Sequence, residues 1–171
     1  LYSMEIFDAN LSTIHGGSGI AVIGHKGSWE KRDIVNKLMA EERKHGFHSR
    51  DRYRRFEKEV IAQRTSTLRY FEKIHNESKV VFGMGAPVKG NTRLNYCGLG
   101  SDDIGSLVEI NELRNGMYAP GSHIPVIMEK DVKDEPDIYY VLAWNFRKAI
   151  EQRYKDIRDK GVEFHFPILT D

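Results

Sequence analysis

The chain has 171 residues, 40% of them apolar and 30% charged, which is the composition of a globular domain large enough to bury a core. Its 26 basic and 25 acidic residues give a net charge of +1, which argues against a dedicated nucleic-acid-binding protein. The sequence lacks the roughly 20-residue apolar run that spans a bilayer, and with Cys97 as its only cysteine it can form neither an internal disulfide nor a cysteine zinc site.

The first half of the sequence predicts a strand pair followed by two helices. Residues 4–9 and 18–25 are rich in strand-forming residues and flank a His-Gly-Gly-Ser turn. Ser28 is expected to cap a helix that ends at Gly46, and Ser49 is expected to cap a longer helix. The longer helix has an apolar stripe that we expect to be core throughout. The stripe consists of Tyr53, Phe56, Val60, Leu68, Phe71 and Ile74.

The second half alternates short strands with helices. Strands are predicted at 79–83, 106–111, 124–128, 137–144 and 162–168, with helices at 90–98 and 146–161. Such alternation indicates parallel β-α-β units. The predicted fold class is therefore α/β, a Rossmann-like three-layer fold with a mostly parallel sheet. We expect one domain over residues 1–171, with the strand pair and two helices in 1–78 and the β-α-β core in 79–171.

A glycine-rich turn follows the strand at 79–83 and precedes a helix. Glycines stand at 83, 85 and 90, with Lys89 just before the last of them. Free N–H groups at a helix N-terminus favour an anion, so the turn suggests a phosphate-type ligand. The spacing matches neither the dinucleotide fingerprint nor the P-loop. The alternative is a tight strand-to-helix turn in which Asn91 serves only as a cap.

Two more polar segments are expected to converge with this turn at the carboxyl ends of the strands. The segment 111–123 contains a Pro-Gly turn and could present Tyr118 and His123 to a ligand, or it could be an ordinary loop. Trp144 and Asn145 lie where the strand at 137–144 gives way to the helix at 146–161. For these two residues the alternative is core packing by the tryptophan and capping by the asparagine.

Two weaker signals lie nearer the start of the chain. The His-Gly-Gly-Ser stretch from His15 to Ser18 can be read simply as a glycine turn. His45 and His48 are three positions apart, but no third metal ligand is evident, so no metal site is predicted. No serine or cysteine stands in a setting that would activate it as a nucleophile.

Four stretches together resemble a known family, the C-terminal domain of sugar C-methyltransferases. In chain order these are FDANLSTIHGGSGIAV, GMGAPVKGNTRLNYCGLG, GMYAPGSHIPV and LAWN, and the resemblance extends from about residue 7 to 168. Members of this family use S-adenosylmethionine to methylate nucleotide-linked keto-deoxysugars. The chain departs from the family pattern at Gly19–Ile20, at Arg93, which replaces an aliphatic residue, and in the segment EINEL.

The resemblance implies that the chain is a piece of a longer cytoplasmic enzyme. An upstream methyl-donor-binding domain and a zinc module would supply S-adenosylmethionine and structural zinc, and this part would contain no cofactor and no catalytic residue. Its partners would be a nucleotide-linked sugar and the upstream domain, not nucleic acid or a membrane. The residues that match the substrate-binding motifs are Gly83, Gly85, Lys89, Gly90, Asn91, Thr92, Asn95, Tyr96, Tyr118, His123, Trp144, Asn145, His15 and Ser18, together with the turn residues Pro120 and Gly121.

Two other functions remain open at this stage. A nicotinamide-dependent oxidoreductase domain would need an acidic residue about 20 positions past the glycines to bind the adenine ribose, and Glu109 on the next strand is the candidate. A non-catalytic module that binds nucleotide-sugars is the other.

Overall fold

The computed structural model describes residues 2–14 and 17–168. The chain divides into two compact units, unit 1 (residues 1–61) and unit 2 (residues 62–171). The division falls inside the long helix α2 (Arg50–Asn76), whereas the sequence suggested a change of architecture after residue 78. The helices of the described residues are too short or too polar to cross a bilayer.

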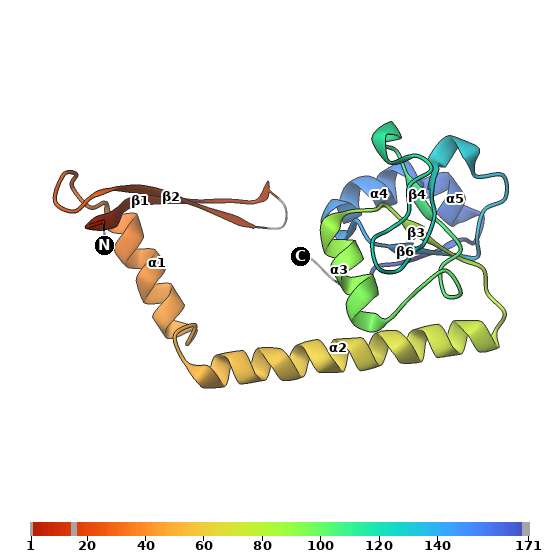
Figure 1. The fold of residues 1–171 in the computed structure, drawn as a ribbon, viewed down its shortest axis with the longest axis horizontal. Coiled ribbons are helices and arrows are strands. Elements are labelled where there is room, and N and C mark those ends of the chain that lie inside the picture. Colours follow the sequence, from red (N-terminus) through yellow and green to blue (C-terminus); the bar gives the residue numbers. More distant parts are fainter. Residues whose placement is uncertain (1, 15–16, 169–171) are drawn as a thin grey trace. The chain divides into compact units, whose positions relative to one another are not determined.

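Unit 1 begins with an antiparallel hairpin. Strand β1 (Met4–Ser12) pairs with β2 (Ser18–His25), which confirms both predicted strands and extends the first (Figure 1). The register shifts between Ile6 and Asp8, so that Phe7 forms a bulge.

Helix α1 (Asp33–Lys44) begins later than the sequence suggested, and the prediction that Ser28 caps it is wrong. The residues before the helix are tied to the hairpin instead. Trp29 stacks on Phe7 with ring centroids 5.4 Å apart, and the Arg32 amide donates to the Phe7 carbonyl at 2.8 Å. The predicted end is confirmed, because Gly46 has the left-handed φ of 71° that follows many helices.

Helix α2 (Arg50–Asn76) is capped as predicted, since the Arg52 amide donates to the Ser49 hydroxyl oxygen at 3.3 Å. The prediction that its apolar stripe is core throughout is wrong. Phe71 and Ile74 are buried, but Tyr53 and Phe56 in the first half remain more than half exposed. Periodicity shows that residues share one face of a helix, but it does not show what covers that face.

Unit 2 is built on a five-stranded parallel sheet with the order β5-β4-β3-β6-β7. This confirms the predicted α/β fold class. The strands are β3 (Val81–Met84), β4 (Leu107–Glu109), β5 (Val126–Met128), β6 (Ile138–Val141) and β7 (Glu163–His165). The helices are α3 (Val88–Cys97), α4 (Arg147–Arg153) and α5 (Lys155–Asp159), with 3-10 turns η2 (Glu112–Arg114), η3 (Glu129–Asp131) and η4 (Trp144–Phe146).

The sheet has a hydrophobic core on each face, which gives the three layers that the sequence predicted (Figure 1). On one face the second half of α2 and helix α3 pack against inward-pointing residues such as Leu107 and Tyr140. On the other face α4 and α5 pack through Ile150, Tyr154 and Ile157. The predicted single helix at 146–161 is therefore two short helices that meet at Tyr154.

A polar network, which we call the Arg93 network, joins α2, α3 and β6 inside the first layer. The partly buried guanidinium of Arg93 donates to Tyr140 Oη at 3.0 Å, to Thr67 Oγ1 at 2.7 Å and to Gln63 Oε1 at 3.1 Å. All three acceptors are neutral. The network fastens the second half of α2 to the sheet with charge-assisted hydrogen bonds.

Candidate functional site

The topology of the sheet creates a switch point between β3 and β6. From β3 the chain proceeds outward to β4 and β5, and then crosses back to place β6 on the other side of β3. Ligands of open parallel sheets bind outside the carboxyl ends of the strands at such a point. Here the two segments that follow β3 and β6 are the glycine turn with the start of α3, and the turn η4.

The structure brings these two predicted segments together. The amides of Leu142 and Ala143 both donate to the Met84 carbonyl, at 3.0 and 3.2 Å. A Cβ added to Gly85 would lie 3.0 Å from Ala143 Cβ, and one added to Gly90 would lie 2.7 Å from Leu142 Cβ. The first turn of α3 therefore rests directly against the end of β6.

Close packing explains much of the glycine pattern. Gly85 has a φ of 82°, which side-chain-bearing residues rarely adopt, and a Cβ at Gly83 would lie 2.4 Å from Leu107 Cδ2. The helix N-cap is Pro87, and Asn91 lies within α3, so the alternative in which Asn91 caps the helix is wrong. These glycines allow the close approach of helix and sheet whether or not a phosphate binds.

Two amides of the glycine turn are engaged within the protein. The Gly85 amide donates to the Val108 carbonyl at 2.7 Å, and the Ala86 amide donates to Glu109 Oε2 at 3.1 Å. An anion at this turn would thus be bound by the first turn of α3, where helix geometry leaves N–H groups without intrahelical acceptors. Lys89 lies exposed in that turn.

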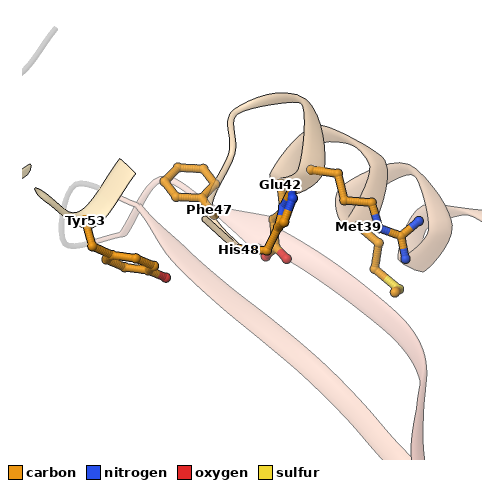
Figure 2. A pocket seen from close by; sticks show the side chains of 6 residues that line it. Met39, Glu42, Phe47, His48 and Tyr53 are labelled. Carbon is orange, nitrogen blue, oxygen red and sulfur yellow. The ribbon is translucent and has the colours of Figure 1, made fainter. Parts of the chain in front are cut away.

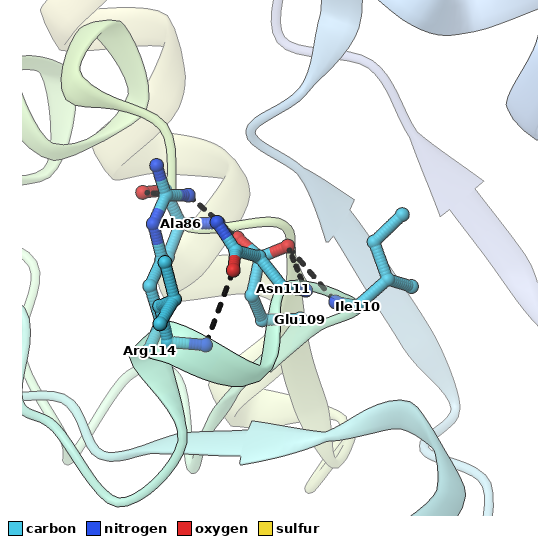
Figure 3. A network of polar contacts seen from close by, with 6 residues as sticks. Ala86, Glu109, Ile110, Asn111 and Arg114 are labelled. Atoms are coloured by element: carbon cyan, nitrogen blue, oxygen red, sulfur yellow. Dashed lines mark hydrogen bonds and ion pairs between the residues drawn. The ribbon is translucent and has the colours of Figure 1, made fainter.

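Glu109 is the centre of a polar cluster beside the glycine turn (Figure 3). In addition to the Ala86 amide, its carboxylate accepts hydrogen bonds from the Ile110 and Asn111 amides, at 2.9 and 3.2 Å, and from Arg114 Nη1 at 2.7 Å. The side chain is 9% exposed. Burial raises the pKa of this carboxyl, but the hydrogen bonds to Ile110, Ala86, Arg114 and Asn111 outweigh it and hold the pKa below its usual value.

Because its oxygens are already engaged by four donors, Glu109 has no vacant position for the ribose hydroxyls of a dinucleotide. This observation counts against the oxidoreductase alternative. The same cluster contains a residue that the sequence did not single out. Arg114 Nη1 also donates to the Ala86 carbonyl at 3.0 Å, so a guanidinium lies beside the residue that leads into α3. Nothing in the local sequence indicated this contact, because Ala86 and Arg114 are far apart in the chain.

The other predicted residues of α3 point in different directions. Asn95 Nδ2 donates to the Asn91 and Pro120 carbonyls, both at 2.9 Å, and Thr92 Oγ1 donates to the Val88 carbonyl at 3.1 Å. The Tyr96 ring and carbonyl contact the Arg64 side chain. Asn91 Oδ1 is buried and has no hydrogen-bond partner within the described part of the chain.

The loop with Tyr118 and His123 does not converge with the glycine turn. The Pro120 carbonyl is bound by Asn95 in the second half of α3, and the Leu107 amide at the start of β4 donates to the Pro125 carbonyl at 2.8 Å. The Pro120–Gly121 turn is present as predicted, with a φ of 83° at Gly121, but it lies toward the amino ends of the strands. Tyr118 and His123 are both exposed there.

Trp144 and Asn145 lie in η4 at the end of β6, beside the glycine turn. Trp144 is buried, as core packing requires, and Asn145 is half-buried. Phe146 precedes the first residue of α4, so Asn145 does not cap that helix.

The early turn belongs to unit 1. Ser18 Oγ donates to the Ile14 carbonyl at 2.9 Å, and His15 lies outside the described residues. An open hollow of about 900 Å³ lies at the corner between α1 and α2 and is lined by Met39, Glu42, Arg43, Phe47, His48 and Tyr53 (Figure 2). Within residues 2–14 and 17–168, no group of three histidine, cysteine or acidic side chains could bind a metal.

Comparison with known proteins identifies the family of the chain. The family model for the C-methyltransferase C-terminal domain matches residues 13–168. The C-methyltransferase NovU of Streptomyces niveus is 31% identical over 169 residues, which cover 98% of this chain and 40% of that protein. The chain thus spans less than half the length of this relative. It belongs to the family of C-methyltransferase C-terminal domains.

Proposed function

We propose that the chain is the nucleotide-sugar-binding part of a longer, cytoplasmic sugar C-methyltransferase. Upstream of it, one domain of that protein binds S-adenosylmethionine and a separate module binds structural zinc. The observation that supports this most directly is the junction of the first turn of α3 with the end of β6 at the switch point of the sheet. A helix N-terminus with a lysine in its first turn suits the diphosphate of a nucleotide-sugar. Two hydrogen bonds at Ala86 hold the turn in place: its amide donates to the Glu109 carboxylate, and its carbonyl accepts from the Arg114 guanidinium.

In this proposal, S-adenosylmethionine supplies the methyl group when it is bound to the upstream part. The present chain binds and orients the acceptor. Lys89 and the first-turn amides of α3 hold the diphosphate, while Trp144 and Asn145 at the end of β6 flank the rest of the ligand. The base that removes the proton next to the sugar carbonyl is expected in the part of the longer protein outside this chain, so no catalytic group is assigned to this chain. Asn95 positions α3 through its hydrogen bond to the Pro120 carbonyl, the Tyr96 carbonyl accepts from Arg64 of α2, and the Thr92 hydroxyl bonds within α3.

Replacing Lys89 with alanine tests the proposed diphosphate contact. A charged hydrogen bond contributes about 1.5–3 kcal/mol, so Lys89→Ala should weaken the binding of nucleoside diphosphates by about 10- to 100-fold. The probes are uridine and thymidine diphosphate and their glucose conjugates, measured by titration calorimetry. Lys89→Arg should retain most of the affinity, and added salt should weaken the wild type more than Lys89→Ala.

The matched control is Lys155→Ala, because Lys155 is an exposed lysine at the start of α5, on the other face of the sheet. The Lys155→Ala variant should bind nucleoside diphosphates with the same affinity as the wild type. Equal affinities for Lys89→Ala and Lys155→Ala would remove Lys89 from the site. A drop in affinity accompanied by a much lower melting temperature would show that Lys89 has a structural role.

A further inference from the structure

Unit 1 leaves most of its apolar side chains in contact with solvent. Among residues 2–14 and 17–61, Val35 is the only apolar side chain that is buried. Domains of about 60 residues normally bury around 60% of the surface of the unfolded chain, and a two-stranded hairpin is at best marginally stable alone. The exposed apolar residues of the hairpin include Met4, Ile6, Leu11, Ile20, Val22 and Ile23.

The register of the hairpin places an apolar cluster on one face. Side chains alternate along a strand, so residues 19, 21, 23 and 25 of β2 share one face with the residues opposite them. Those pairs are Leu11 with Gly19, Ala9 with Ala21, Ile6 with Ile23 and Met4 with His25. We call the cluster of Met4, Ile6, Leu11 and Ile23 the apolar hairpin face, and each of its four members is between 42% and 65% exposed.

The opposite face of the hairpin is already used within unit 1. A Cβ added to Gly24 would lie 2.8 Å from Trp29 Cδ1, so Trp29 covers the face to which Gly24 belongs. The same face presents Glu5, Asp8 and Asn10, which are polar, opposite Gly24, Val22 and Ile20. Arg32, just before α1, lies 3.5 Å from the Asp8 carboxylate. The unit thus packs Trp29 and Arg32 against the Gly24 and Asp8 end of the mixed face, whereas Ile20 and Val22 on that face stay exposed, and all four members of the apolar hairpin face stay exposed.

We propose that the apolar hairpin face is the contact surface for the segment of the longer protein that precedes this domain. The inference rests on the proposed function, in which the chain is the C-terminal part of a methyltransferase. The matched relative is much longer than this chain, and the matching family model describes a C-terminal domain, so the remaining length of such a protein comes before it. A preceding segment would join the chain next to β1, and this tether gives it a high effective concentration at the hairpin.

The test compares amide hydrogen exchange in the hairpin of the full-length protein and of the 171-residue chain. We expect the β1 and β2 amides to exchange at least about tenfold more slowly in the full-length protein, because a covered hairpin opens less often. Ile23→Asp in the full-length protein should restore the fast exchange of the short chain. The matched control is Ile20→Asp, which makes the same change on the same strand at equal exposure, 54% against 55%, but on the other face.

Equal exchange in the two proteins, or equal effects of Ile23→Asp and Ile20→Asp, would overturn the proposal. Sedimentation of the 171-residue chain provides a second measurement. A dimer that Ile23→Asp dissociates would assign the face to a second copy of the chain and would also overturn it. Titration of the same preparations with uridine and thymidine diphosphate-glucose separates this inference from the proposed function, since sugar binding can fail while the hairpin remains protected, and the reverse.

Discussion

Glu109→Ala should lower the free energy of unfolding of unit 2 by about 3 kcal/mol at neutral pH, because it removes one partner of a buried ion pair. Four donors lose their acceptor at once, and three of them are backbone amides that cannot turn toward solvent. Removing one partner of a buried ion pair usually costs about 3–5 kcal/mol. We expect the low end of that range because the Arg114 side chain is 40% exposed and can be hydrated. Urea unfolding monitored by circular dichroism gives the change.

Glu112→Ala is the control for this experiment. Its carboxylate also pairs with a cation, Lys130 at 3.0 Å, but both side chains are largely exposed, so the loss should stay below about 0.5 kcal/mol. If Glu109→Ala were as mild as Glu112→Ala, the cluster in Figure 3 would contribute little to holding the glycine turn.

The contribution of Glu109 should depend on pH in a defined direction. Its pKa is lowered in the folded protein, so its stabilising effect is complete above the pKa of an unfolded glutamate, about 4.3, and is lost as pH falls toward the folded value. The difference in stability between wild type and Glu109→Ala should therefore shrink below about pH 4.3. Urea midpoints at pH 7 and at several pH values below 4.3 measure it, and a difference that stayed constant or grew in acid would contradict the assignment.

Gly90→Val should destabilise unit 2 by about 2–3 kcal/mol, because overpacked positions force backbone shifts. The added Cβ would lie 2.7 Å from Leu142 Cβ and 3.2 Å from Pro87 Cγ, so α3 must move away from the end of β6. We expect the same variant to bind nucleoside diphosphates more weakly than wild type, since the first turn of α3 would be displaced. Thermal unfolding and titration of one preparation check both effects.

The same substitution at Gly19 provides the comparison. A Cβ there meets nothing within 4 Å, and the residue lies in a strand, which favours valine. Gly19→Val should therefore melt at or slightly above the wild-type temperature. A Gly90→Val variant that behaved like Gly19→Val would show that the helix and strand can separate without cost.

The sequence predicted the fold class because the alternation of short apolar runs with helical segments is a local signal. It failed where the outcome depends on distant partners. Ser28 is a residue type that often caps helices, but Trp29 stacks on Phe7 and fixes the next residues against the hairpin, so the helix begins only at Asp33. Tyr53 and Phe56 have the same helical spacing as the buried Phe71, and only the fold shows that they remain more than half exposed.

The candidate site was predictable in part for the same reason. The glycine turn and Trp144–Asn145 each follow a predicted strand, and parallel strands bring such segments to one edge. The loop containing His123 also follows a strand, but it extends back along α3 to contact Asn95, which no local pattern indicates. The contacts of Glu109 and Arg114 with Ala86 bridge two separate connections of the sheet, so they become visible only in three dimensions.

The Arg93 network also has a consequence for the descent of this protein. Its guanidinium serves three acceptors from α2 and β6, and an aliphatic residue at position 93 would remove the charged donor of Thr67 and Tyr140, leaving the Thr67 hydroxyl its bond to the Gln63 carbonyl at 2.9 Å. Replacing Arg93 alone removes three hydrogen bonds at once, so we expect an exchange at this position to be tolerated best when Thr67 and Tyr140 change with it. We expect the residues at the four positions of the network to change together among relatives of this chain. These positions are 63, 67, 93 and 140.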